Sequence, residues 1–441
     1  MQSFFGNRRV VITGIGLVSP LGNSKHALWE GLNGGRSPVS GIDDFPSAAE
    51  IVSYGAAAKE FSGQINDFGE LEKDQKKMIR KALKLMCRET MMGVAVAQAA
   101  LQDASLKTGD LPAERSGCVY GSDYMLTMPE DFLAGIRTCQ DESGQFQYQR
   151  WGQEGMPQVT PLWLLRYLPN MPASHIAIYN DLRGPNNSLT LREASSNAAV
   201  GEAAFTIARN HADMMIAGAT GTRLHPMNAI HAMQQEEIAS PDVPPAEASR
   251  PFDRDRTGMV LGEGAGALVL EELHSAETRG ATIYGEIVSR ASSTVASPSG
   301  IADRRQALSN VITAALRDAA AEPGQIGHVH AHGISTRSGD AEEAAAIAHV
   351  LGTGPDARPV TAAKSYFGNL GAGSGMVELI ASLLALQHGN LFPMLNYQNP
   401  DPDCPLLIAT AANGLAAGEN FLNLSCTPQG QATGILIRSP T

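Results

Sequence analysis

The sequence is poor in cysteine, and the few cysteines that it has form no recognisable site. They number five, an odd count, and none stands in the CxxC spacing of redox or zinc sites: Cys87, Cys118, Cys139, Cys404 and Cys426. A disulfide framework and a structural zinc site are therefore not expected. This cysteine usage is typical of a reducing compartment, so we expect the protein in the cytoplasm.

Basic residues and long apolar runs are also scarce. The chain has 33 Lys and Arg against 45 Asp and Glu, a formal net charge of −12, which argues against non-specific nucleic-acid binding. No run of about 18 uncharged apolar residues predicts a transmembrane helix. Gly14 and Gly16 lack the third glycine of a dinucleotide-binding turn. We therefore expect no nucleic acid, no membrane, no metal and no cofactor bound to this chain.

The chain nevertheless has ample material for a large core, since 43% of its 441 residues are hydrophobic. Predicted strands alternate with predicted helices, which indicates an α/β fold with mostly parallel sheets. The expected helices cover 71–102, 195–210, 304–320, 340–351 and 375–388. The expected strands cover 10–16, 212–217, 265–270, 329–332, 420–424 and 434–438.

One segment, residues 136–160, breaks this alternation. It is polar and rich in Gln, and it carries Trp151. We interpret it as a surface insertion, either a lid or partner contact, or a solvated loop.

Several motifs together carry a family resemblance. In chain order they are VVITGIGLVSPLG (10–22), LPNMPASHIA (168–177), SRPFDRDRTGMVLGEGAGALVLEE (249–272), HAHGISTRSGD (330–340), AKSYFGNLGAGSG (363–375) and NYQNPDPDCPL (396–406). Each piece alone is weak, but the ordered series resembles the β-ketoacyl-acyl-carrier-protein synthases of the thiolase superfamily. The resemblance spans nearly the whole chain.

The resemblance implies a specific architecture. Two similar βαβαβαβ halves, 1–275 and 276–441, would meet near residues 272–280 and stack as five layers, α-β-α-β-α. It also implies a tight dimer with the active site near its centre. The sequence pattern without the resemblance indicates only the α/β class.

The resemblance also implies a cysteine nucleophile, which a helix N-terminus would activate. Counting back from Gly201-Glu202 places Glu193 at that position. A carboxylate cannot form a thioester, so we expect no ordinary condensation through Glu193. Ser195 and Ser196 lie close by but a turn further along, where polar residues commonly begin a helix.

The other catalytic positions are partly kept. His332 matches the first family histidine and Lys364 the family lysine, but the second histidine position holds Asn369. An asparagine can donate a hydrogen bond to an oxyanion but cannot relay a proton. Glu378 is a lone acid on an apolar helix and needs a partner, for which Lys364 is the candidate. Asp340 and Thr336 match further polar residues that line the family's site.

The C-terminal gate loop of the family also differs here. Its corresponding stretch is 425–431, and the position of the guarding phenylalanine is assigned to Pro428. Cys426 lies in the same loop, but nothing near it in sequence prepares it as a nucleophile.

These departures leave several functions open. The first is a non-condensing partner of an active ketosynthase, similar to a chain-length factor. The second is a malonyl decarboxylase, which a Glu193 carboxylate would oppose unless it is protonated or paired with His332 or Lys364. A third uses Glu193, with its pKa raised by burial, as a general base on an acyl thioester. A non-catalytic structural or binding protein is the fourth.

The expected partners follow from a basic stretch in this acidic chain: Lys73, Lys76, Lys77, Arg80, Lys81 and Lys84. We expect it to dock an acidic acyl carrier protein, which would bring its own phosphopantetheine arm. A solvated helix face is the alternative. The second expected partner is another ketosynthase-fold chain, in a homodimer or a heterodimer with an active ketosynthase.

Overall fold

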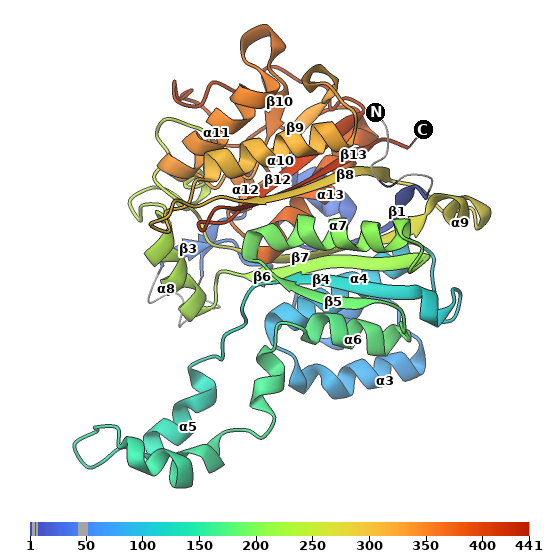
Figure 1. Cartoon of the computed structure of the whole chain (residues 1–441). Coiled ribbons are helices and arrows are strands. Elements are labelled where there is room, and N and C mark those ends of the chain that lie inside the picture. Colours follow the sequence, from blue (N-terminus) through green and yellow to red (C-terminus); the bar gives the residue numbers. More distant parts are fainter. Residues whose placement is uncertain (2–4, 6–7, 43–51, 441) are drawn as a thin grey trace.

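The computed structural model describes residues 1, 5, 8–42 and 52–440. They form five layers in the order helices, sheet, helices, sheet, helices (Figure 1). The polypeptide ends that carry the N and C labels lie on the same side of the molecule (Figure 1). The predicted thiolase-like layering is confirmed.

The sheet of the first half has the strand order β5-β4-β6-β7-β1. Its strands are β1 (Val10–Val18), β4 (Ser116–Ser122), β5 (Asn186–Thr190), β6 (Met214–Thr222) and β7 (Glu263–Glu272). Strands β4, β5 and β6 run parallel, whereas β7 runs antiparallel to both β6 and β1. The parallel strands therefore end at one edge of the sheet.

The second half repeats this topology, with the order β8-β13-β12-β9-β10-β11. Its strands are β8 (Gly285–Thr294), β9 (His328–His330), β10 (Pro359–Thr361), β11 (Leu407–Ile408), β12 (Asn420–Cys426) and β13 (Gln431–Arg438). Strands β9, β10 and β12 are parallel, and β13 is antiparallel to its neighbours. Strands β1 and β8 pair antiparallel and join the two sheets.

The two halves are thus similar, as expected, but the expectation of mostly parallel sheets is wrong. Antiparallel pairs occupy the inner part of each half, where β7 is buried along almost its whole length. Antiparallel strands with one solvated face show alternating polar and apolar residues. A strand that is buried on both faces lacks this alternation, so its sequence does not reveal that it is antiparallel.

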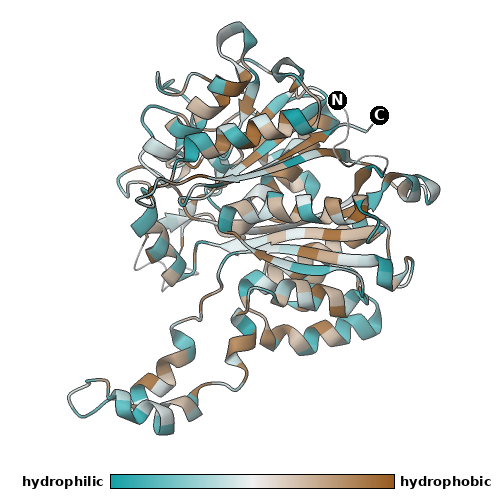
Figure 2. Ribbon diagram, viewed as in Figure 1, coloured by the Kyte–Doolittle hydropathy of each residue, from teal (hydrophilic) through white to brown (hydrophobic). Residues whose placement is uncertain are grey.

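Two apolar helices form the central layer, α7 (Ser195–Ala208) and α13 (Ser374–His388) (Figure 1). In α13 every residue from Ser374 to Ala385 is buried. A helix that is hydrophobic all round belongs between two covered surfaces. Figure 2 shows the corresponding contrast, with apolar colour gathered in the interior layers and polar colour on the outer helices.

The remaining helices cover the outer faces or connect the layers. They are α1 (Lys25–Asn33), α3 (Lys73–Ala82), α4 (Arg88–Asp103), α5 (Glu130–Thr138), α6 (Met171–Asn180), α8 (Pro226–Gln235), α9 (Leu273–Thr278), α10 (Arg304–Asp318), α11 (Arg337–Leu351) and α12 (Lys364–Phe367). A small sheet pairs β2 (Ser40–Gly41) with β3 (Tyr54–Gly55). Among the described helices, none is long and apolar enough to cross a membrane.

The helix expected over 71–102 is two helices, α3 and α4. A tight turn at 83–85 follows α3, and Met86 and Cys87 are extended before α4 begins. The lysines that we assign to one basic stretch therefore belong mainly to α3, with Lys84 in the turn.

The segment expected as an insertion lies in an arm that projects from the body (Figure 1). Helix α5 leads out, short helical turns occupy 148–158, and the turn at 163–167 leads back to α6. Trp151 packs edge-on against Phe132 at 6.1 Å and near Phe146 at 6.0 Å. Tyr148 is 78% exposed. The arm is thus a structured element with its own small core, and not a plain loop.

Replacing Trp151 with Ala should loosen the arm alone. The loss removes the side chain on which Phe132 and Phe146 pack, so limited proteolysis should cleave within 136–160 faster, while the melting temperature of the body changes little. The control is Tyr148→Ala, which removes an exposed ring and should leave the cleavage rate unchanged. Equal cleavage of wild type and Trp151→Ala, or a collapse of the whole fold, would contradict this account.

Candidate functional site

The candidate site lies where the parallel strands of the first half end. Asp123 directly follows β4, Arg223 directly follows β6, and Glu193 comes three residues after β5. Because these strands are parallel, their carboxyl ends share one edge of the sheet. Three charged side chains are therefore brought together at the start of the buried helix α7.

Glu193 is bound on several sides. The Arg223 Nη2 donates a hydrogen bond to Glu193 Oε1, and Asn369 Nδ2 donates to the same oxygen at 3.0 Å. On its other side, Arg223 Nη1 lies 2.8 Å from Asp123 Oδ2. Arg223 is fully buried and Glu193 is 2% exposed. The structure thus places Glu193 and Asn369 in direct contact, and it adds Arg223, a partner of Glu193 that the sequence interpretation missed.

These charges determine the ionisation of Glu193. Burial raises the pKa of its carboxyl, but Arg223 and Arg192 outweigh burial and hold the pKa below its ordinary value. The hypothesis that burial makes Glu193 a base titrating near neutrality is therefore wrong. Pairing of Glu193 with His332 or Lys364, the condition named above for a malonyl decarboxylase, is not met, because the hydrogen-bond partners of Glu193 are Arg223 and Asn369.

Asp123 shares Arg223 with Glu193. Burial raises the pKa of the Asp123 carboxyl, and Arg223 lowers it in part. Both Asp123 and Arg223 could have been suspected from sequence, since each is a charged residue directly after a buried apolar strand. Nothing in the sequence indicates that they meet each other.

The short 3-10 turn 192–194 carries Glu193 into place. Arg192 has φ of 54°, a left-handed backbone that turns the chain from β5 into α7. Its side chain donates to Gln235, from the end of α8, and to Gln429 at 3.2 Å, from the turn between β12 and β13. This contact closes the rim of the site over Glu193.

A second buried group lies in the C-terminal half. Lys364 Nζ forms an ion pair with Glu378 and donates to the His332 carbonyl at 2.8 Å, and it lies 3.3 Å from His332 Nδ1. The predicted partnership of Glu378 with Lys364 is confirmed. Burial and the nearby Lys364 charge lower the pKa of His332 well below its usual value, so the imidazole is neutral at neutral pH.

The loop after β9 is held by two buried carboxylates. Asp340 accepts backbone N–H bonds from Ile334, Ser335 and Phe252, and burial raises its pKa to about 6. Glu343, which the sequence interpretation missed, accepts the N–H groups of His332 and Gly333 at 2.6 and 2.7 Å. Thr336 precedes α11 as its N-cap residue. These contacts fix the position of His332.

A small cavity opens beside His332. Its volume is about 10 Å³, and its lining includes Glu236, Arg304, Asp340, Cys426 and Thr427. This is roughly the space of one water molecule. An acyl chain does not fit there without movement of the lining side chains.

The other candidate nucleophiles are committed or inert. Ser195 Oγ donates to the Ser122 carbonyl at 2.9 Å, and Ser196 Oγ donates to the Ala372 carbonyl at 2.6 Å. Cys426 lines the small cavity, but burial raises the pKa of its thiol, which keeps it protonated. Pro428 is half-buried in the turn between β12 and β13, and Thr427 lines the cavity in its place.

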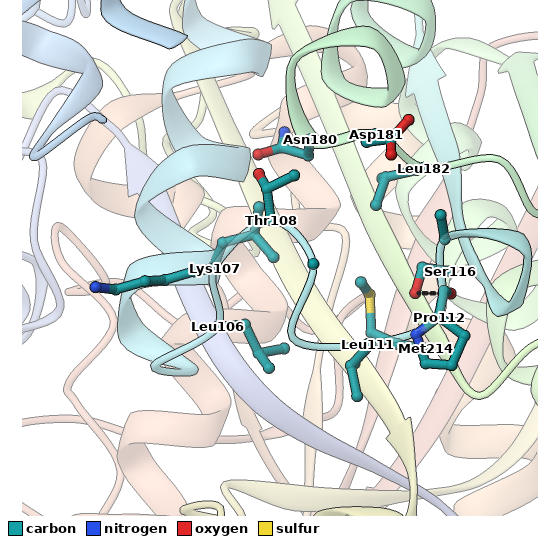
Figure 3. Close-up of a pocket in the computed structure, with 13 residues that line it drawn as sticks. Leu106, Lys107, Thr108, Leu111, Pro112, Ser116, Asn180, Asp181, Leu182 and Met214 are labelled. Carbon is teal, nitrogen blue, oxygen red and sulfur yellow. Dashed lines mark hydrogen bonds between the residues drawn. The ribbon is translucent and has the colours of Figure 1, made fainter. Parts of the chain in front are cut away.

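A larger pocket lies away from this site. It has a volume of about 270 Å³, and Leu106, Leu111, Leu182 and Met214 form an apolar wall (Figure 3). Met214 begins β6, whose other end leads to Arg223. The pocket is therefore at the opposite edge of the sheet from Glu193.

The basic stretch lies on the outer face of the first half, mainly on α3 (Figure 1). Lys77, Arg80 and Lys81 are exposed, and Lys76 is half-buried. No group of three or more His, Cys, Asp or Glu side chains in the described part of the chain is placed to hold a metal.

Comparison with known proteins agrees with this geometry. The family model "Beta-ketoacyl synthase, N-terminal domain" matches residues 7–276, and "Beta-ketoacyl synthase, C-terminal domain" matches 284–398. The chain belongs to the β-ketoacyl synthase family. The resemblance expected from the ordered motifs is therefore confirmed.

Similar β-ketoacyl synthases include curated enzymes from bacteria. The 3-oxoacyl-[acyl-carrier-protein] synthase 2 of Synechocystis sp. is 32% identical over 404 residues, covering 90% of both chains. The enzyme of the same name from Staphylococcus aureus is 32% identical over 410 residues, covering 91% of both.

Solved structures give the same family. A β-ketoacyl synthase from Burkholderia phymatum superposes with a TM-score of 0.82 at 27% identity, covering 98% of this chain and 100% of that one. The ishigamide ketosynthase/chain length factor gives 0.81 at 28%, with the same coverage. A type II PKS acyl-carrier protein in complex with its ketosynthase gives 0.80 at 24%, which shows the fold alone.

Removing the Glu193 carboxylate should destabilise this β-ketoacyl synthase homologue strongly. In Glu193→Ala the buried Arg223 loses a charged partner, so the free energy of unfolding should fall by about 3–5 kcal/mol. The near-isosteric control Glu193→Gln keeps an oxygen acceptor and should lose less. Urea unfolding monitored by circular dichroism measures both, and equal stability of wild type and Glu193→Ala would contradict the ion pair.

Wild type and Glu193→Gln should differ in how their stability responds to acid. Because the folded-state pKa of Glu193 lies below its unfolded value, its stabilisation is complete above the unfolded pKa of about 4.3. It is lost as the pH falls below that value towards the folded pKa. The stability difference between wild type and Glu193→Gln should thus be larger near neutral pH than in acid, where it shrinks.

Proposed function

We propose that this β-ketoacyl synthase homologue is a non-condensing subunit, similar to a chain-length factor, that works beside an active ketosynthase. The observation that carries the proposal is the carboxylate of Glu193, buried against Arg223 and Asn369 at the position where the family resemblance puts the nucleophile. A carboxylate held in this way cannot accept an acyl chain as a thioester.

The surroundings of Glu193 support the same reading. Condensation in this family needs a thiolate, room for the acyl group and donors free to bind an oxyanion. Asn369 uses its Nδ2 on Glu193, the neighbouring serine hydroxyls are bonded to carbonyls, and the cavity beside His332 is about 10 Å³. The thiolate, the room for an acyl group and the free donors are therefore each missing, and each for a separate reason.

The decarboxylase alternative, and the alternative in which Glu193 is a general base on an acyl thioester, gain no support from this geometry. A general base needs a pKa near the working pH, whereas Arg223 and Arg192 keep the pKa of Glu193 low. An ionised Glu193 would also repel the carboxylate of a malonyl group in a buried site. The fourth alternative, a protein without any carrier-protein or acyl partner, differs from our proposal only in its interactions.

Two surfaces support pairing with a second ketosynthase-fold chain. Strand β5 lies at the edge of the sheet, and an edge strand has backbone groups with which another strand can pair. The arm exposes apolar side chains, including Leu162 at 62% and Leu164 at 52%. One similar structure, the ishigamide ketosynthase/chain length factor, agrees with such a pair.

Assays with and without an active synthase test the proposal. The chain alone should not condense malonyl- and acyl-carrier protein. Together with a homologue from the same pathway that keeps its cysteine and both histidines, it should co-purify and alter the length of the product, as measured by mass spectrometry. Glu193→Gln is the matched variant, and it should support the partner as wild type does. Condensing activity of the chain alone would overturn the proposal. A product length that does not change when the chain is added would also contradict it.

Charge reversal on α3 tests the proposed carrier-protein dock. Lys76→Glu with Lys77→Glu should weaken binding to an acyl carrier protein about tenfold at low salt, with a smaller effect at high salt. The control is Arg305→Glu, which changes an exposed charge on α10, in the outer layer of the other half. Binding that is equal in all three proteins, measured by titration calorimetry, would refute this dock.

A further inference from the structure

The surroundings of Glu193 are those of a bound carboxylate ligand. One of its oxygens accepts hydrogen bonds from a guanidinium and an amide, and the other lies 3.7 Å from Arg192 Nε. Guanidinium and amide donors around one buried carboxylate are the groups that proteins use to bind carboxylates of small molecules. Here the carboxylate comes from the chain itself.

The pocket has more donor capacity than Glu193 uses. Arg223 Nε and Arg192 Nε are buried without a hydrogen-bond partner among the described residues. Arg223 is fully buried, and the Arg192 side chain is 12% exposed. Both donors come from residues other than Glu193 and would therefore remain in a variant that lacks its carboxylate.

The charges of the pocket also favour an anion. Without Glu193, Arg223 would keep Asp123 as its ion-pair partner, whereas Arg192 would have no ion-pair partner among the described residues, although its charge also acts on Asp123 and Glu236. The group would then carry an excess positive charge in a buried position, which is costly unless an anion neutralises it. The pocket thus requires a negative group at the position of the Glu193 carboxylate.

We propose that Arg223, Arg192 and Asn369 form a carboxylate-binding pocket, and that Glu193 fills it as a tethered ligand that excludes carboxylate-bearing molecules. This inference deepens the proposed function and rests on it for one point, the exclusion of a malonyl carboxylate from the centre. The pocket itself is independent of whether the chain has a partner.

The ligand class and its size follow from the atoms removed. Glu193→Ala deletes a methylene and a carboxylate, which leaves room for formate. Glu193→Gly also deletes the β-carbon and leaves room for acetate. The pocket should therefore take small monocarboxylates, and the preferred one should grow with the space that the substitution creates.

Thermal unfolding in the presence of small anions tests the pocket. Formate should raise the melting temperature of Glu193→Ala in a saturable way, and acetate should do so for Glu193→Gly. At a formate concentration 100 times its Kd, the folding equilibrium constant should increase about 100-fold. Wild type and Glu193→Gln, whose pockets are filled, should not respond. Sodium chloride at the same ionic strength is the control for general salt effects.

Two results would overturn the inference. The first is no response of either variant to formate or acetate, and the second is an equal rise with chloride. If Glu193→Ala does not fold in plain buffer, its refolding yield decides instead. Recovery with formate but not with chloride supports the pocket, and failure with both contradicts it. The condensation assay with a partner synthase is a separate experiment. The anion test can therefore contradict the pocket while the proposed function stands, and the condensation assay can contradict the proposed function while the pocket stands.

Discussion

The buried ion pair between Arg223 and Glu193 holds the centre of this molecule together. Arg223 directly follows strand β6 of the first half, Glu193 lies in the turn before the central helix α7, and Asn369 contacts the same carboxylate from the second half. A buried charge is tolerated only when it is paired and hydrogen-bonded. The two sheets therefore meet around one carboxylate, and its loss would leave the buried Arg223 with Asp123 as its remaining charged partner.

A second ion pair, Lys364 with Glu378, stands in the other half and fixes His332. The two groups are close enough for Glu193 to influence the pKa values of both His332 and Glu378. The centre is thus a set of neutralised charges with little open space, and not a cleft with a reactive group. This arrangement agrees with the proposed non-condensing role, in which the edge strand β5 and the projecting arm would contact a partner.

The sequence predicts this fold well because the ordered motifs carry the family, and with it the five layers. It also predicts the Lys364–Glu378 pair, since a lone acid on an apolar helix needs a cation. It does not predict Arg223 as the partner of Glu193, because the two are 30 residues apart in the sequence and meet only through the parallel strands. The antiparallel inner strands and the structured arm are missed for a related reason. The sequence of a strand buried on both faces does not reveal whether the strand is parallel or antiparallel. The order of the arm depends on contacts of Trp151, which its polar composition does not predict.

The most direct test of the central claim is whether the chain can be acylated. Incubation with an acyl-carrier protein or an acyl thioester, followed by intact-protein mass spectrometry, reports any covalent acyl group. The account predicts that the mass of the chain stays unchanged, because Glu193 is held by Arg223 and all five cysteines are buried. An acyl adduct that maps to residues 192–197 would contradict it.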